Sequence, residues 1–156
     1  MKKGMFIATI VSLFMFCIFG TAIASDIATQ EECMAKCKEA ADMVAEKGLE
    51  ATLAVISDKE GPFVWKDTYV FCIDTEKKAN VAHPITPNLV GKNLMHVKDV
   101  NGKLFFAEFI NTANGAGSGW VEYMWPKPGE KTPSLKATYV YKVPGESVFM
   151  AAGIYK

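Results

Sequence analysis

The sequence predicts an α+β fold in which a long N-terminal helix precedes an antiparallel sheet of five strands. Three observations lead to this prediction. An apolar stripe recurs at helical spacing early in the chain, a short aromatic and β-branched run follows it, and the last third alternates between apolar and polar residues. The predicted order is therefore one helix, two strands, short helices, and three strands joined by hairpins.

The predicted N-terminal helix has a clear start and an interruption. Thr29 and Glu32 form a capping box, in which each side chain satisfies a free backbone N–H of the first turn. Apolar residues then recur at helical spacing to about Lys47. Gly48 interrupts the pattern, and a second amphipathic stretch continues to about Asp58. The pattern thus predicts a long helix that is kinked near Gly48.

The predicted strands differ in how they are buried. The first is apolar throughout, which is typical of burial on both faces, whereas the third and fourth alternate. The predicted strands are residues 69–73, 80–83, 119–125, 135–143 and 147–155. Between the second and third strands, prolines make residues 84–92 irregular. Residues 104–113 are predicted to form a short helix, because Phe105 and Phe109 lie one helical turn apart.

The first residues have the layout of a secretory signal peptide. Two lysines are followed by an almost wholly apolar stretch, residues 5–20, and then by a small-x-small pattern. We expect residues 1–24 to be a signal peptide cleaved before Ser25, and residues 25–156 to form one domain in the periplasm or outside the cell. The alternative is an uncleaved leader that tethers the chain to the membrane.

Composition excludes several classes of function. The 17 basic and 17 acidic residues balance, so there is no excess positive charge for nucleic-acid phosphates. The chain contains no arginine, so any bound anion must be held by lysine, hydroxyl, imidazole or backbone N–H groups. No arrangement typical of an enzyme, a zinc site or a c-type haem site is present, and we expect neither catalysis nor a cofactor.

Three cysteines follow the predicted cleavage site: Cys33, Cys37 and Cys72. In an oxidising compartment they are candidates for one disulfide and one free thiol, and the sequence does not determine which pair forms. Two alternatives stay open. The cysteines could be small buried apolar residues, or Cys33 and Cys37 could form a redox-active pair.

Six short motifs occur in a consistent order along the chain. They are Tyr69-Val-Phe-Cys-Ile-Asp74 with Ala82-His83-Pro84, Leu89-Val-Gly-Lys-Asn93, Asp99-Val-Asn-Gly-Lys103, Gly119-Trp-Val-Glu-Tyr-Met-Trp-Pro126, Lys136-Ala-Thr-Tyr-Val140 and Ala152-Gly-Ile-Tyr155. Together they resemble the type 2 single Cache domain over about residues 28–156.

This resemblance implies a PAS-like five-stranded antiparallel sheet. The long N-terminal helix would pack on one face, and short helices and loops would cover a ligand pocket on the other. It also implies an extracytoplasmic sensor, as in chemoreceptors and histidine kinases, for short carboxylates such as acetate, propionate, lactate or pyruvate. Because no second membrane span or transmitter follows in this sequence, we expect a stand-alone binding protein. The alternatives are a subunit that presents its ligand to a separate membrane receptor and a domain whose role has changed.

Five residues are candidates for ligand binding. Lys136 matches the lysine of the family's Lys-x-x-Tyr strand and lies in an apolar strand, where a cation needs a partner such as a bound carboxylate; the ordinary alternative is an ammonium that reaches water at an edge. Tyr123 and Trp125 share one strand face. His83 is expected near the pocket mouth, able to donate to an anion or titrate near neutral pH, and Phe71 is expected to supply an apolar wall.

A second hypothesis needs no ligand. The sheet could serve as a protein-interaction module that forms a homodimer through the N-terminal helix, with Val44 and Leu53 in the contact. The two hypotheses differ in whether the sheet carries a small-molecule pocket.

Overall fold

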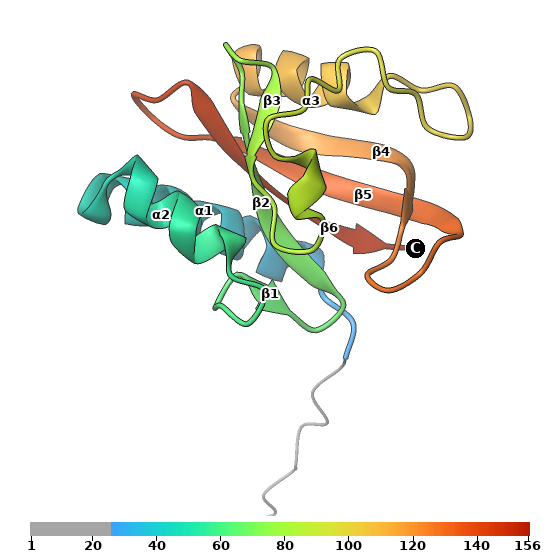
Figure 1. Cartoon of the computed structure of the whole chain (residues 1–156), viewed down its shortest axis with the longest axis horizontal. Coiled ribbons are helices and arrows are strands. Elements are labelled where there is room, and N and C mark those ends of the chain that lie inside the picture. The colour runs from blue at the N-terminus through green and yellow to red at the C-terminus, as the bar shows by residue number, and fades with distance from the viewer. Residues whose placement is uncertain (1–25) are drawn as a thin grey trace, which may run out of the picture.

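The computed structural model describes residues 26–156, which form an antiparallel sheet with helices on both faces (Figure 1). In chain order the elements are α1 (Gln30–Lys47), α2 (Leu49–Ser57), β1 (Val64–Trp65), β2 (Thr68–Asp74), β3 (Ala79–Ala82), the 3-10 helix η1 (Pro87–Leu89), α3 (Phe105–Asn114), β4 (Ser118–Pro126), β5 (Pro133–Lys142) and β6 (Val148–Tyr155). The predicted signal peptide, residues 1–24, lies outside the described residues.

The sheet has six strands, all paired antiparallel. Its order is β1-β2-β6-β5-β4, and β3 also pairs with β2. The five predicted strands are all present, and the addition is β1, which pairs with the start of β2. A strand of two residues is too short to show alternation, so the sequence pattern did not reveal it.

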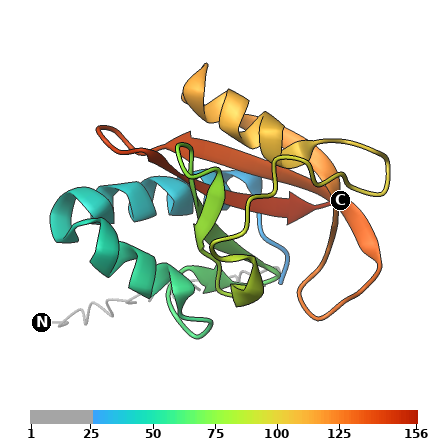
Figure 2. The ribbon, with the colours of Figure 1, turned by 45° about the horizontal axis from the view of Figure 1, so that its top comes forward.

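Helices α1 and α2 cover one face of the sheet (Figure 2). The capping box is present, with the Thr29 hydroxyl accepting from the Glu32 N–H and the Glu32 carboxylate accepting from the Thr29 N–H. The predicted interruption is confirmed as well, because Gly48 has φ +84° and separates the two helices.

The apolar stripe of α1 packs within the chain. Val44 is 6% exposed, and Leu53 of α2 packs against the same core. Since this stripe is already used, a partner helix could meet only the other, charged face of α1. The homodimer through the N-terminal helix stays a prediction, but its expected contact residues Val44 and Leu53 belong to the core.

Helix α3 and the irregular segment before it lie on the opposite face of the sheet (Figure 2). The predicted helix over 104–113 is confirmed, with bounds one residue later. Its apolar side is buried against β2, β4 and β5, where it forms a second, aromatic core. The two cores use opposite faces of the same sheet, as the alternation of β4 and β5 requires.

All three cysteines of the described chain are free and buried in the core between α1 and the sheet. The disulfide expected from them is therefore not formed, and the alternative of three small buried side chains describes them. Burial raises the pKa of the Cys33 thiol to about 12 and also raises the pKa of Cys37 and Cys72. Buried thiols that resist ionisation are poor redox groups.

Candidate ligand-binding site

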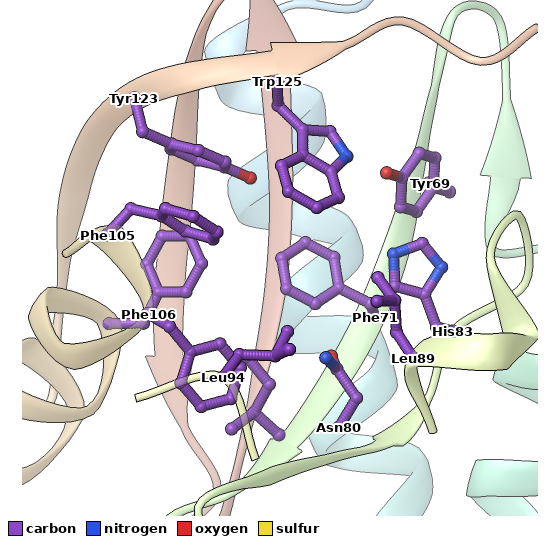
Figure 3. Close-up of a pocket in the computed structure, with 12 residues that line it drawn as sticks. Tyr69, Phe71, Asn80, His83, Leu89, Leu94, Phe105, Phe106, Tyr123 and Trp125 are labelled. Carbon is purple, nitrogen blue, oxygen red and sulfur yellow. The ribbon is translucent and has the colours of Figure 1, made fainter. Parts of the chain in front are cut away.

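A pocket lies on the aromatic face of the sheet, beneath α3 and the segment that follows β3 (Figure 3). It encloses about 280 Å³ of atom-free space, a figure that includes its open mouth. Its lining is mostly aromatic and aliphatic: Tyr69, Phe71, Ile73, Asn80, His83, Leu89, Leu94, Phe105, Phe106, Phe109, Tyr123 and Trp125. A small apolar hollow with a few polar groups is typical of small-molecule sites.

One wall is built from rings that strand β4 and helix α3 bring together. Tyr123 and Trp125 lie two residues apart on β4 and so point to the same face. Phe105, from the first turn of α3, stacks on Tyr123 with ring centroids 4.6 Å apart and an 8° angle between the planes. The hydroxyls of Tyr123 and Thr138 are hydrogen-bonded at 3.2 Å, which fixes the Tyr123 ring in the wall.

His83 lies just after β3 and is only 4% exposed. Its Nδ1 accepts a hydrogen bond from the Thr86 backbone N–H at 3.0 Å, which leaves the proton of the neutral ring on Nε2. Burial, reinforced by the charge of Lys136, lowers the pKa of His83 to about 3. The expectation that His83 titrates near neutral pH is therefore wrong, because the buried ring stays neutral; it can still donate from Nε2.

Lys136 occupies the middle of the sheet. It lies on β5 between Tyr123 of β4 and Tyr155 of β6, with its side chain on the pocket face. The side chain passes over Gly153 of β6, where an added Cβ would lie 2.9 Å from the Lys136 Cε. A glycine at this position is what allows the lysine to lie across the neighbouring strand toward β2.

The Lys136 ammonium ends among aromatic rings and has no hydrogen bond. The side chain is 0% exposed, and Nζ has no partner among the described residues. Nζ lies 4.4 Å from the ring centroid of Tyr69, 4.7 Å from that of Tyr155 and 5.9 Å from that of Phe71. These cation–π contacts stabilise the charge only in part, and burial lowers the pKa of Lys136 to about 7.

The structure brings four of the five predicted site residues together in the pocket: Phe71, His83, Tyr123 and Trp125. Lys136 is not among the lining residues, but it touches the rings of Tyr69 and Phe71, which are. The expected alternative, an ammonium that reaches water at an edge, is excluded because β5 is an interior strand and the side chain is buried.

Sequence reasoning missed several residues of the pocket. Tyr69 could have been found, because it alternates with Phe71 on one strand, and Phe105 and Phe109 because they share a helix face. Leu89 begins one of the six motifs, but Asn80 and Leu94 had no usable signal. They come from a four-residue strand and from irregular chain, where no period assigns a side chain to a face.

A second hollow lies on the outside of the pocket wall. It is lined by Tyr69 and Trp125 together with Ile85 and residues 126–130. Tyr69 and Trp125 line both spaces, so these two rings form the partition between the pocket and the outer hollow.

The sequence profile of the family described as Single Cache domain 2 matches residues 25–156. The chain belongs to this family. The resemblance inferred from the motif series is thereby confirmed, and so is the α+β fold with its antiparallel sheet.

Similar proteins are sensors of chemotaxis. The methyl-accepting chemotaxis protein McpP of Pseudomonas putida is 30% identical over 89 residues, which are 57% of this chain; the chain spans 16% of that receptor's length. Among solved structures, a periplasmic sensor domain of a chemotaxis protein has 28% identity and a TM-score of 0.64, covering 80% of this chain and 88% of that one.

Two further structures have the same fold. A methyl-accepting chemotaxis protein of Vibrio parahaemolyticus has 25% identity and a TM-score of 0.67. The match covers 81% of this chain and 87% of the Vibrio chain. A Cache chemosensory domain solved to explain carboxylic acid recognition has 25% identity and a TM-score of 0.66. The match covers 80% of this chain and 91% of that domain. This Cache chain is therefore a sensor domain of the chemoreceptor type.

Periplasmic relatives support an extracytoplasmic location for this Cache domain. No helix between residues 26 and 156 has the length and apolar character needed to cross a membrane. Within the same range, no three His, Cys, Asp or Glu side chains are grouped so that they could hold a metal ion. The polar side chains that line the pocket are those of Tyr69, Asn80, His83, Tyr123 and Trp125, and the Lys136 ammonium lies beside them.

Proposed function

We propose that this Cache domain binds a short organic carboxylate outside the cytoplasm, and that the carboxylate pairs with the ammonium of Lys136. The observation that carries the proposal is the burial of Nζ without a hydrogen-bond partner among the described residues. A buried ammonium that lacks a partner is costly, and the cost is removed when an anion pairs with it. A role in binding, without catalysis, agrees with this use of the lysine.

The surroundings of Lys136 favour a small anion that is supplied from outside. None of the residues that line the pocket is acidic, so no side chain of the pocket can neutralise the ammonium. The neutral His83 offers an N–H donor at the pocket, and most of the remaining wall is aromatic or aliphatic. This combination suits a carboxylate with a short carbon chain.

The size of the pocket limits the length of the ligand. The atom-free space of about 280 Å³ includes the open mouth, so the enclosed part is smaller and leaves room only for a ligand with a short carbon chain. Acids of the size of acetate, propionate, lactate and pyruvate fit this limit. Because the rings of Tyr69 and Phe71 contact the ammonium, we expect one of them to shift when the carboxylate arrives.

The relatives give independent support of the same kind. The Cache chemosensory domain with a TM-score of 0.66 was solved for its recognition of carboxylic acids, and it covers 80% of this chain. A similar ligand class for the present chain is the simplest extension of that similarity.

Calorimetric titration of the four acids tests the proposal. We expect saturable binding of at least one acid, weakened about a hundredfold by Lys136→Met, which keeps the length of the side chain and removes its charge. Lys142→Met is the matched control, because Lys142 lies on the same strand and face but outside the pocket. Equal affinity of the Lys136→Met variant and the native chain would contradict the proposed role.

A further inference from the structure

Asn80 is the second polar side chain at the pocket that has no partner. It lies on β3 opposite Ile73 of β2, is 2% exposed, and its Oδ1 makes no hydrogen bond. Figure 3 shows its amide pointing into the pocket between Phe71 and Leu94. Leaving a buried acceptor without a partner costs about 1–3 kcal/mol, so a donor in the pocket would stabilise it.

Other buried polar side chains of the described chain have hydrogen-bond partners, unlike Asn80 Oδ1 and Lys136 Nζ. Thr68 donates to the Gly153 carbonyl, Thr75 to the Ser147 carbonyl, and the Asp74 carboxylate accepts from two backbone N–H groups. Among the described residues, the buried side-chain atoms without a hydrogen-bond partner are Trp65 Nε1, Asn80 Oδ1 and Lys136 Nζ. Trp65 packs against the core on the other face of the sheet, so the two on the pocket face are a neutral amide and a cation.

The two groups lie at different positions along β2, from which we infer that one carboxylate does not reach both. The Lys136 ammonium lies against the rings of Tyr69 and Phe71, whereas Asn80 is paired with Ile73 further along β2. Successive residues of a strand advance by about 3.3 Å, so the amide faces a different part of the pocket. A ligand that satisfies both must carry a second polar group on its carbon chain.

The chemistry of the lining indicates which group this is. A ligand ammonium would introduce another cation close to Lys136 with no acidic side chain among the lining residues to balance it. A hydroxyl is neutral, and it can both donate to an amide oxygen and accept from an amide N–H. It therefore pairs with Asn80 whichever way the amide is turned.

We propose that the ligand is a short hydroxy acid, and that Asn80 selects it by hydrogen-bonding the hydroxyl on its carbon chain. This inference rests on the proposed function, in which Lys136 holds the carboxylate. It adds a specificity-determining residue and narrows the ligand class from simple carboxylates to hydroxylated ones.

The test compares acids that differ only in the hydroxyl. Propanoate, 2-hydroxypropanoate and 3-hydroxypropanoate are titrated into the full chain, and we expect at least one hydroxy acid to bind about tenfold more tightly than propanoate, as one added hydrogen bond allows. In Asn80→Leu this preference should disappear while the affinity for propanoate is kept or improved. Leu89→Ala is the matched control, because loss of an apolar wall should weaken all three acids by a similar factor.

Each outcome decides the question. If propanoate binds at least as tightly as both hydroxy acids in the native chain, the inference is overturned while the carboxylate site stands. A preference that persists in Asn80→Leu removes Asn80 from its assigned role, and Asn80→Ala repeats the comparison if the leucine variant fails to fold. No binding of any acid overturns the proposed function and this inference together.

Discussion

At the scale of single residues, the proposed ligand binding depends on the ammonium of Lys136, which the fold surrounds with aromatic rings. Lys136 touches Tyr69 and Tyr155, and His83 lies nearby. Burial raises the pKa of Tyr69 to about 12, also raises that of Tyr155, and lowers that of His83 to about 3. None of these neighbours changes charge between pH 6 and pH 9, so Lys136, with a pKa of about 7, is the group around the pocket that titrates there.

This arrangement predicts how ligand binding depends on pH. A carboxylate pairs with the protonated lysine, whose fraction in the free protein falls above pH 7, so affinity should decrease about tenfold per pH unit between pH 7.5 and pH 9. Proton uptake on binding, measured by calorimetry in buffers of different ionisation enthalpy, checks this. An affinity that is flat over this range would contradict the assignment, and the Lys142→Met control should keep the native slope.

The same depressed pKa predicts a stability effect in the unliganded chain. The unfolded state, with an ordinary lysine pKa of 10.5, binds more protons than the folded state between about pH 7 and pH 10. The free energy of unfolding should therefore rise with pH over this window. Denaturant melts of the native chain and of Lys136→Met should differ in this slope, which the methionine variant lacks; parallel pH profiles would show that the lysine keeps its charge.

At the scale of elements, the pairing of β5 with β6 makes room for the lysine. Lys136 is opposite Tyr155 and Thr138 is opposite Gly153. A Cβ at residue 153 would lie 2.6 Å from the Ala137 carbonyl oxygen and 2.9 Å from the Lys136 Cε, and it would also meet the Thr138 hydroxyl. The Ala137 carbonyl and the Thr138 hydroxyl cannot easily move away, because they belong to the neighbouring strand. Packing of these two strands therefore requires glycine at residue 153.

Gly153→Ala should consequently destabilise the fold and displace the lysine. Overpacking of this kind costs about 1–3 kcal/mol, to be measured by chemical denaturation. Carboxylate affinity should fall at the same time, because Nζ can no longer reach the rings of Tyr69 and Phe71. An alanine variant of native stability and native affinity would show that the neighbouring strand adapts.

At the scale of the whole molecule, two cores lie on opposite faces of one sheet. The core under α1 holds Cys33, Cys37 and Cys72, and the core under α3 holds the pocket. The ligand is therefore expected to bind on one face of the sheet, while the reactivity of the thiols measures opening of the core on the other face. Both cores share β2, β5 and β6, so they are expected to unfold together.

The reactivity of the thiols should follow global unfolding. Under native conditions an alkylating reagent should leave Cys33, Cys37 and Cys72 unlabelled, and all three should react once the chain is denatured. Saturation with a carboxylate ligand should slow labelling further, since a ligand that binds only the folded state stabilises it. Peptide mass mapping identifies the labelled positions, and rapid native labelling of Cys33 and Cys37 would revive the redox alternative.

The sequence by itself determined the order and type of the elements. Its helical spacing predicted α1, the break at Gly48 and helix α3, and its alternation predicted β4 and β5. Short apolar runs bounded by turn residues predicted β2, β3 and β6. It also determined the family, since the motif series runs through the whole domain. The pocket residues Phe71, His83, Tyr123 and Trp125 were found because they occur within those motifs.

Only the tertiary structure decided the chemistry around the pocket. Whether Lys136 meets water or aromatic rings depends on Tyr69 and Gly153, which come from strands distant in sequence. The low pKa of His83 likewise follows from burial, a property of the packed molecule. That the three cysteines are free is also seen only in the packed structure. Asn80 gave no sequence signal, because an unpartnered amide can be recognised only when every neighbour that could satisfy it is in place.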